Sequence, residues 1–333
     1  MNNELREILK FHCGKYPLMQ VRDAVKLIYQ NEFGGGHFIA DESASLAYLK
    51  EEISKIKTDE TPIVNIGNGT ARINITTLPH VTLNRLFVVS ANKCHGDIES
   101  FKSKLNLIYE LPFDKDEIDN YLKQYSAAGY PAVSHSEIYR NAYNPAYRII
   151  DEKYIALLDL FAAIDRKSLA PIVIGIDGKC GSGKSTIAEL LREVYQCDVI
   201  HMDDFFLPPD LRTEERRNEI GGNVHYERFA EEVMSKIKSH EPFEYRVFDC
   251  SIMDYNGTKV VHPKDLIIVE GSYSSRFRFD LNIFIDVSDE IQKQRIVARD
   301  GEFMWDKFEN IWIPMENAYF DEFNIREKSD KII

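Results

Sequence analysis

The sequence has few cysteines and no long apolar run, and both absences narrow the class of protein. The five cysteines are odd in number, widely spaced and without a Cys-x-x-Cys pair. This excludes a disulfide scaffold and a conventional zinc module, and it fits a reducing compartment. No window approaches the ~18 uninterrupted apolar residues of a membrane helix. The first residues, MNNELREILKFHCGKYP, carry charges where a signal peptide has an apolar centre. We therefore expect a cytoplasmic protein without a membrane segment.

Positive charge is scarce in the second half of the chain. Residues 1–170 hold 20 basic and 22 acidic side chains, whereas residues 171–333 hold 21 and 32, so the second half carries nearly all of the net charge of −13. Because nucleic-acid phosphates require a basic surface, we expect no bulk nucleic-acid binding. A single nucleotide can still bind, since that needs only a local pocket of cations and backbone amides.

The chain of 333 residues contains no internal repeat, and at roughly 150 residues per domain its length suggests two domains. Residues 1–145 are predicted to form a mainly helical α+β domain. Helices are expected after Asp41 and after Asp114, and a β-hairpin at 63–75 around Asn68-Gly69. Residues 146–168 are predicted to form a connecting helix.

Residues 169–333 form the second predicted domain, in which short apolar runs alternate with helical patterns. Such alternation predicts an α/β fold, with a parallel sheet covered by helices on both faces. The expected strands are 172–176, 199–202, 266–269 and 283–287, and the expected helices are 184–194, 226–237 and 290–299.

The segment GKCGSGKS at 178–185 fits the phosphate-loop pattern G-x-x-x-x-G-K-[ST] between an expected strand and an expected helix. Backbone N–H groups of such a loop surround phosphate oxygens, Lys184 reaches the β and γ phosphates, and the Ser185 hydroxyl is a Mg²⁺ ligand. The sequence therefore predicts a nucleoside-triphosphate site with ATP and Mg²⁺ as cofactors. The predicted ATP-binding residues are Gly178, Lys179, Cys180, Gly181, Ser182, Gly183, Lys184, Ser185 and Thr186.

Cys180 lies inside this loop. A thiol on an electropositive loop is expected to have a lowered pKa, which gives the hypothesis that Cys180 is sensitive to oxidation. The alternative is that Cys180 is a small side chain tolerated at a variable position.

Acidic residues follow two of the expected strands, where ligands bind in parallel α/β sheets. A kinase that acts on a hydroxyl needs a carboxylate within hydrogen-bond reach of that hydroxyl, and Asp203 is the first candidate, with Asp204 the second. Glu270 ends the third strand and is expected to hold Mg²⁺ together with Ser185. The alternatives are helix capping by the aspartates and an ion pair for Glu270.

Arg295 and Arg299 are four residues apart, on one face of the expected helix 290–299. They are predicted to neutralise charge on the transferred phosphoryl group, and the alternative is a solvated helix face. No Asn-Lys-x-Asp motif follows the phosphate loop, which favours a small-molecule kinase over a GTPase.

The motifs GIDGKCGSGKST, HMDDFF, FDCS, IIVEGSYS and RIVARD together resemble the uridine kinase/phosphoribulokinase family of P-loop kinases, over residues 171–333. The resemblance implies a P-loop kinase-type fold, with ATP on the phosphate loop and Asp203 as the base on a sugar hydroxyl. It also implies Mg²⁺ support by Glu270 and closure of Arg295 and Arg299 over the phosphates. The Asp-Asp-Phe-Phe form is also similar to nicotinamide riboside kinases.

Two segments depart from that family's pattern. Residues 223–229 read NVHYERF where uridine kinases have an Asp-His-Pro-Asp stretch, and residues 245–249 correspond loosely to the base-pocket segment. Arg246 adds a charge that suits an anionic or very polar substrate. The predicted substrate-binding residues are Asp203, Asp204, His225, Tyr226, Arg246 and Asp249.

The predicted function is ATP-dependent phosphorylation of a small molecule, most simply the 5′-hydroxyl of a nucleoside. Two alternatives remain open. One is a kinase for a non-nucleoside acceptor, such as a vitamin precursor, glycerate or a sugar phosphate. The other is a regulator in which ATP binding by the second domain signals to the first. The expected partner is a nucleoside-like substrate, and a homo-oligomer is compatible with the sequence.

The first domain resembles an uncharacterised module that accompanies such kinases, through NEFGGGH at 31–37 and PAVSHSE at 131–137. Imidazole and carboxylate side chains in these stretches suggest a metal or substrate site made of Glu32, His37, His135 and Glu137. The alternative is a tight turn at the glycines with ordinary surface polar residues.

Overall fold

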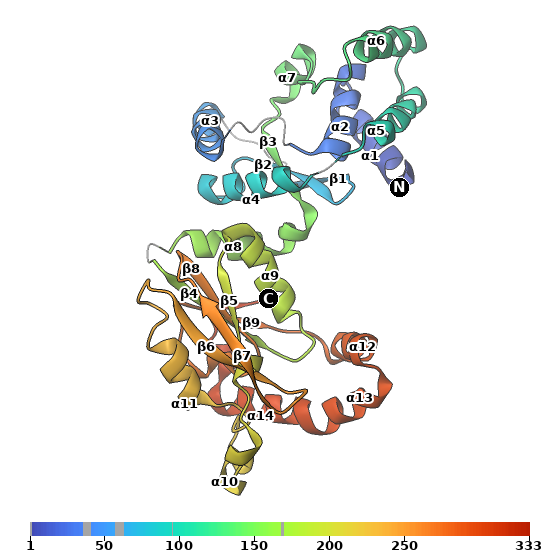
Figure 1. Cartoon of the computed structure of the whole chain (residues 1–333). Coiled ribbons are helices and arrows are strands. Elements are labelled where there is room, and N and C mark those ends of the chain that lie inside the picture. Colours follow the sequence, from blue (N-terminus) through green and yellow to red (C-terminus); the bar gives the residue numbers. More distant parts are fainter. Residues whose placement is uncertain (1, 36–40, 57–62, 95, 168–169) are drawn as a thin grey trace. The chain divides into compact units, whose positions relative to one another are not determined.

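The computed structural model describes residues 2–35, 41–56, 63–94, 96–167 and 170–333 (Figure 1). The chain divides into two compact units, Met1–Arg166 and Lys167–Ile333, and each is described here by itself. Among the described residues, no helix combines the length and the apolar composition needed to cross a bilayer.

In the N-terminal unit, helices pack against a small antiparallel sheet in the order β1-β2-β3. Helices α1 and α2 contact β1, and α4 contacts β3. The strands are β1 (Ile63–Gly67), β2 (Thr70–Asn74) and β3 (Tyr147–Asp151). The helices are α1 (Asn2–Lys15), α2 (Val21–Phe33), α3 (Glu42–Lys55), α4 (His80–Lys93), α5 (Ile98–Leu105), α6 (Lys115–Ala127), α7 (Glu137–Tyr143) and α8 (Leu158–Asp165).

The hairpin and the two helix starts predicted for the first unit are confirmed. Strands β1 and β2 form the predicted hairpin, and both Asn68 and Gly69 adopt the positive φ that such a turn requires. Asp41 accepts a hydrogen bond from the backbone N–H of Ala44, and Asp114 caps α6 in the same manner.

The prediction of a single connecting helix over 146–168 is wrong in its first part. Residues Tyr147–Asp151 form β3, which pairs antiparallel with β2. They are followed by a short 3₁₀ turn and then by α8. A short apolar run fits a buried helix or a strand equally well by periodicity, and here the edge of β2 supplies a hydrogen-bonding partner.

In the C-terminal unit, five parallel strands form a sheet in the order β10-β9-β4-β8-β5 (Figure 1). The strands are β4 (Ile172–Gly178), β5 (Asp198–His201), β8 (Leu266–Glu270), β9 (Leu281–Ile285) and β10 (Lys331–Ile332). Their register places Glu270 beside both Ile176 and His201. The start of the phosphate loop and the acid that ends β8 therefore lie at one edge of the sheet.

Both faces of this sheet are covered. On one face, Val173, Val269 and Phe284 join a core that includes Phe229 and Tyr319. Because side chains alternate along a strand, the intervening residues of β4 and β8 face the opposite side, where α9 (Lys184–Tyr195) contacts both strands. The predicted fold class, a parallel sheet with helices on both faces after a mainly helical α+β region, is confirmed.

Several elements of this unit were not predicted. They are the antiparallel hairpin β6 (Phe243–Asp249) and β7 (Asp254–Val261), and the C-terminal helices α13 (Glu302–Lys307), α14 (Ile313–Phe323) and α15 (Ile325–Lys328). The expected helix 226–237 is α11 (Tyr226–Phe229) followed by a π-helical turn (Ala230–Met234), and α10 (Glu214–Asn218) precedes it. The helix predicted at 290–299 is confirmed as α12 (Asp289–Asp300).

Gly178 joins β4 to the phosphate loop at φ +139°, and a Cβ atom there would lie 2.2 Å from the carbonyl oxygen of Ile285. Gly178→Ala is expected to destabilise the protein by about 2–5 kcal/mol, since strain and a backbone clash add together. Gly257→Ala is the matched control, because Gly257 has φ +80° with no atom within 4 Å of its added Cβ. Urea unfolding should show the larger loss of stability at Gly178, and equal losses would contradict the clash.

Candidate active site

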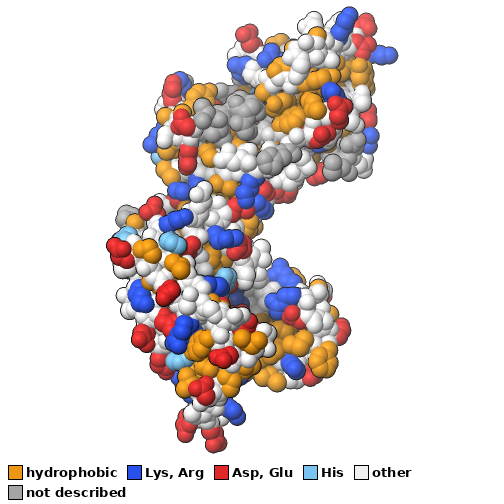
Figure 2. Space-filling model, viewed as in Figure 1, with side chains coloured by type: hydrophobic (Ala, Val, Ile, Leu, Met, Phe, Trp, Pro, Cys, Tyr) orange, Lys and Arg blue, Asp and Glu red, His pale blue; other side chains and the backbone are white. Residues whose placement is uncertain are grey.

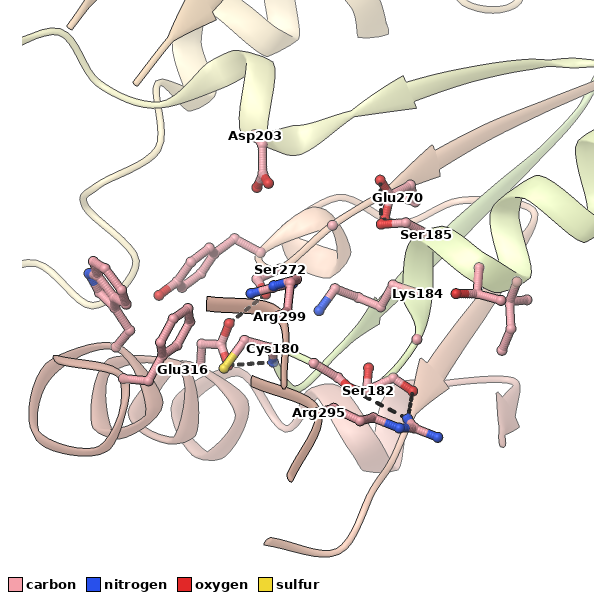
Figure 3. A pocket seen from close by; sticks show the side chains of 18 of the residues that line it. Cys180, Ser182, Lys184, Ser185, Asp203, Glu270, Ser272, Arg295, Arg299 and Glu316 are labelled. Atoms are coloured by element: carbon pink, nitrogen blue, oxygen red, sulfur yellow. Dashed lines mark hydrogen bonds between the residues drawn. The ribbon is translucent and has the colours of Figure 1, made fainter. Parts of the chain in front are cut away.

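The phosphate loop connects Gly178 at the end of β4 to Lys184 at the start of α9. Gly181 and Gly183 have positive φ values of 72° and 107°, which let the loop turn sharply. The Lys184 ammonium is buried and donates to the carbonyl oxygens of Gly178 at 2.7 Å and Lys179 at 2.9 Å (Figure 3). The Lys184 side chain therefore lies across the loop, where its ammonium can reach an anion bound by the loop.

A cavity of about 770 Å³ opens at the carboxyl ends of β4, β5 and β8. This volume is in the usual range for small-molecule sites. Figure 2 shows the C-terminal unit hollowed beside the α12–α13 segment, with Lys and Arg side chains nearby. The lining residues are Cys180–Ile187 of the loop and α9, Asp203, Phe206, Asn223, Glu270, Gly271, Ser272, Tyr273, Arg295, Arg299, Phe308, Trp312 and Glu316.

Two features of the loop are compatible with the binding of an anion. The Ser182 hydroxyl is buried and has no hydrogen-bond partner among the described residues, although it lines the cavity. The backbone N–H of Cys180 donates at 2.8 Å to the carboxylate of Glu316, which also accepts from the Ser272 hydroxyl at 2.6 Å. A carboxylate thus already occupies one of the loop's donors, as a phosphate oxygen would.

The expected lowered pKa of Cys180 is wrong. Burial and, after it, the nearby Glu316 carboxylate together raise the pKa of the Cys180 thiol to about 12. The loop's positive potential is outweighed because the thiol is taken out of water beside a negative charge. Cys180 is therefore a thiol at neutral pH, which removes the chemical basis for oxidation sensitivity.

The acids predicted at the strand ends meet at the cavity. Asp203 follows β5 and extends into the cavity across from Lys184 (Figure 3). Ser185 and Glu270 lie 3.2 Å apart, and Glu270 also bonds His201 Nδ1 at 2.5 Å, which raises the pKa of His201. The protein that surrounds Asp203 and the charge of Glu270 raise the pKa of Asp203, and Lys184 counteracts them.

The side chain of Asp204 lies outside the cavity, unlike that of the adjacent Asp203. Its carboxylate is buried and accepts hydrogen bonds from the Tyr245 hydroxyl at 2.9 Å and the Lys259 ammonium at 2.8 Å. It does not line the cavity. The prediction of Asp204 as a substrate contact is therefore not supported by this geometry, because the 3₁₀ turn after β5 directs the two adjacent acids to different surroundings.

Both predicted arginines come from α12 and line the cavity. Arg295 donates to the carbonyl oxygens of Gly181 at 3.3 Å and Ser182 at 2.8 Å, so it braces the phosphate loop. Arg299 bonds Asp300 with its Nε and one terminal nitrogen. The helix thus presents two cations beside the loop, as its i, i+4 spacing suggested.

Six other predicted residues do not line the cavity. Gly178 ends β4, and the side chains of the other five lie elsewhere. Lys179 pairs with Asp289, and Arg246 pairs with Glu232. His225 caps α11, and Asp249 accepts from Ser251. Tyr226 is packed against the core of the unit. None of these roles was visible in the sequence, because each partner is set by the fold around it.

Most residues that line the cavity opposite the phosphate loop were not predicted as site residues from the sequence. These residues are Phe206, Asn223, Ser272, Tyr273, Phe308, Trp312 and Glu316. Glu316 is 136 positions from Cys180, and nothing in the spacing of the chain connects the two. The aromatic content of the segment WIPMENAYF was the one signal present, and it fits an ordinary helix as well.

The N-terminal metal or substrate site was predicted from four residues, of which His37 lies outside the described part. The structure does not bring Glu32 and His135 together: Glu32 pairs with Lys104 at 2.6 Å, whereas His135 bonds Asp23 at 2.8 Å. Glu137 starts α7 and is exposed. Within the described ranges, no group of three or more His, Cys, Asp or Glu side chains is arranged to hold a metal ion.

Comparisons with known proteins match the C-terminal unit. A family model described as an AAA domain matches residues 174–310. A uridine kinase of Latilactobacillus sakei is 31% identical over 172 residues, which are 46% of this chain and 80% of the relative. A uridine kinase of Anoxybacillus flavithermus is 28% identical over 170 residues, 45% of this chain and 81% of that one.

Among solved structures, a possible uridine kinase from Bacillus stearothermophilus matches with a TM-score of 0.38 and 20% identity, over 53% of this chain and all of that one. The family is shown by the 31% identity to the Latilactobacillus sakei uridine kinase over 80% of that relative. Through its C-terminal half, the chain belongs to the uridine kinase family.

Proposed function

We propose that the C-terminal unit transfers the γ-phosphoryl group of ATP, bound with Mg²⁺, to the 5′-hydroxyl of a nucleoside. The observation that carries this proposal is the Asp203 carboxylate, which faces the same cavity as Lys184 and the loop amides. A site that only bound a nucleotide would not need a carboxylate opposite the phosphates. The names of the curated relatives support the same substrate class.

The chemistry of the side chains fits the two cofactors. The hydroxyl of Ser185 and the carboxylate of Glu270 are hard oxygen donors, and Mg²⁺ in kinases takes one or two such ligands beside phosphates and water. When bound, the ion would neutralise charge on the phosphate oxygens. Lys184 and the unpartnered Ser182 hydroxyl then orient the triphosphate, and Arg295 braces the loop.

Asp203 would hold the acceptor. Its carboxylate accepts a hydrogen bond from the acceptor hydroxyl, orients the oxygen toward the γ phosphorus and takes the proton as the new bond forms. The surroundings that raise the pKa of Asp203 make its carboxylate a better proton acceptor than an isolated aspartate. Arg299 lines the same cavity and would meet the charge of the transferred group.

The nucleoside is favoured over other acceptors by the aromatic wall of the cavity. Phe206, Tyr273, Phe308 and Trp312 offer flat faces on which a base can stack. A non-nucleoside acceptor remains the second candidate because His225 and Tyr226, two of the predicted substrate-binding residues, do not line the cavity.

Transfer of labelled γ-phosphate from ATP to a panel of nucleosides, modified nucleosides and small polyols tests the proposal. We expect a labelled nucleoside monophosphate. Label on a polyol or vitamin precursor would favour the second candidate. Slow release of labelled inorganic phosphate, equal with and without every acceptor, would instead support a nucleotide-gated regulator and overturn the proposed transfer.

Glu316 predicts a change in nucleotide affinity. Its carboxylate competes for the Cys180 N–H and places a negative charge beside the phosphates. Glu316→Gln should therefore tighten ATP binding about tenfold, which corresponds to about 1.4 kcal/mol. Titration calorimetry measures this, with Glu322→Gln as the control, since Glu322 lies on the same helix but is exposed. Weaker binding in Glu316→Gln would mean that the carboxylate holds the loop in its binding shape.

A further inference from the structure

The N-terminal unit contains a small cavity, lined by tyrosines and by three buried polar side chains, that the kinase chemistry does not use. Its volume is about 120 Å³, and it lies among α1, β2, α7 and the start of β3. His12, Arg72 and Asn74 contribute the polar part of its lining. All three are at least nine-tenths buried, with 2%, 6% and 3% of their surfaces exposed. A cavity of this size holds a carboxylate or a phosphate group with room for water.

Two of these side chains have a nitrogen atom without a partner. Among the described residues, neither His12 Nε2 nor Asn74 Nδ2 makes a hydrogen bond. The oxygen of the Asn74 side chain, by contrast, accepts from the backbone N–H of Thr76 at 2.9 Å, so the orientation of the amide is fixed. Buried polar atoms are nearly always satisfied, and two of them in one cavity indicate a bound molecule that completes their hydrogen bonds.

The third group, Arg72, supplies charge. Its guanidinium donates to Gln30 Oε1 at 2.6 Å and 3.0 Å and lies 4.5 Å from the centre of the Tyr147 ring. Both partners are neutral, and among the described residues Arg72 forms no ion pair. A buried guanidinium without an anion is unfavourable, because desolvation is not offset by an opposite charge.

The neighbouring acid does not fill this role. Asp23 is the buried carboxylate of the same region, and it already accepts hydrogen bonds from His135, from the Ser136 hydroxyl and from the Ser136 N–H. Burial lowers the pKa of both His12 and His135, and the positive charge of Arg72 lowers both further. The combined effect lowers the pKa of His12 to about 3. His12 is therefore neutral, and its Nε2 can carry the proton that a ligand oxygen would accept.

A second cavity, of about 520 Å³, shares Pro145 and Tyr147 with the small one. It is lined by Lys26, a second buried cation, and by apolar and aromatic side chains that include Phe87. The pKa of Lys26 is lowered to about 8, chiefly by burial and then by Arg72, so the two cations act on each other. Glu52, which lines the same cavity, is paired with Arg148, and an anion would stabilise the charges of Arg72 and Lys26.

We propose that the N-terminal unit binds a small organic anion, whose carboxylate or phosphate group is held by Arg72, Asn74 and His12. Arg72 provides the charge and a donor, and Asn74 Nδ2 and His12 Nε2 provide two further donors from separate elements. This site is independent of the proposed kinase reaction, since all of its residues belong to the N-terminal unit.

The test follows the NMR signals of ¹⁵N-labelled arginine and asparagine side chains in the full chain. Because each signal reports on one side chain, binding of phosphate at the P-loop does not obscure binding at Arg72 and Asn74. Acetate and inorganic phosphate are titrated separately, as their ammonium salts, at constant ionic strength. Ammonium chloride is titrated in the same way as the reference, so that the cation is the same in every titration. We expect saturable shifts of the Arg72 Nε–H and Asn74 amide signals with acetate, with phosphate or with both. The anion whose titration saturates at the lower concentration shows whether the site prefers a carboxylate or a phosphate group.

Variants distinguish a binding site from a merely structural cluster. Asn74→Asp keeps the oxygen that caps Thr76 but replaces the unpartnered donor by a negative charge, so it should weaken binding of the anion about tenfold or more. Arg72→Met removes the charge and should do the same. Arg6→Met is the matched control, because Arg6 is a half-buried arginine of the same unit paired with Glu110. It should bind as the parent does.

Three results would each overturn the proposal. They are the absence of a saturable shift with either anion, a shift of the same size with chloride, and binding that survives in Asn74→Asp. Thermal unfolding of each variant without added anion shows whether the fold is intact. If Arg72→Met fails to fold, Asn74→Asp alone decides the outcome.

Discussion

Asp203→Asn is expected to lower the rate of phosphoryl transfer by about 10²–10⁴-fold, the usual contribution of a positioned general base. The amide can still contact an acceptor hydroxyl, but it cannot take its proton. Because Asp203 faces the phosphate loop across the cavity and makes no hydrogen bond to it, ATP affinity should change little. Single-turnover transfer and ATP titration measure the two effects separately. Equal losses of rate and of affinity would contradict the role assigned to Asp203.

Asp204→Asn is the matched control for this variant. The Asp204 carboxylate is tied to Tyr245 and Lys259 and lies outside the cavity. Removing its charge should cost about 1–3 kcal/mol of stability, because the buried Tyr245 hydroxyl and the exposed Lys259 ammonium lose a charged acceptor. The transfer rate of the folded fraction should remain close to that of the parent. A rate loss as large as that of Asp203→Asn would mean that the two acids act as one unit.

Lys184→Ala is the second change with a large expected effect. Lys184 donates to the carbonyl oxygens of Gly178 and Lys179 and lies where the β and γ phosphates would bind. Its removal should lower the transfer rate by about 10²–10³-fold, comparable to the loss of a transition-state hydrogen-bond donor. Unlike Asp203→Asn, it should also weaken ATP binding, since the ammonium meets the phosphates before and during transfer.

Lys179→Ala provides the comparison within the same loop. The Lys179 ammonium points away from the cavity and pairs with Asp289 at 3.0 Å and Asp286 at 3.7 Å. Its loss should have a much smaller effect on both rate and affinity. Steady-state kinetics of the two variants in parallel decide this, and similar losses would show that general positive charge, rather than the position of Lys184, supports the reaction.

The parts of the site that could be predicted are those whose geometry is local. Residues 178–185 form a continuous strand–loop–helix unit, so their pattern alone fixes how amides, lysine and serine are arranged. Asp203 and Glu270 follow from a rule nearly as simple, because the carboxyl ends of parallel strands share one edge of a sheet. The pairing of β5 with β8 brings these two acids to that edge.

The parts that could not be predicted depend on contacts between distant segments. Glu316 reaches Cys180 only because α14 packs beside the loop, and no spacing in the sequence encodes that contact. The same holds for Tyr147–Asp151, which became a strand because β2 offered an edge. The direction of Asp204 was equally hidden, since its partners Tyr245 and Lys259 belong to a hairpin that was not predicted.

The contact between Glu316 and the phosphate loop links the nucleotide to the end of the chain. Helix α14 continues through α15 into β10, and β10 forms the edge of the sheet beside β9. An incoming triphosphate that displaces the Glu316 carboxylate would therefore release one contact of a segment whose other end is anchored in the sheet by backbone pairing. Nucleotide binding is then expected to change the surroundings of α14 while β10 keeps its place beside β9.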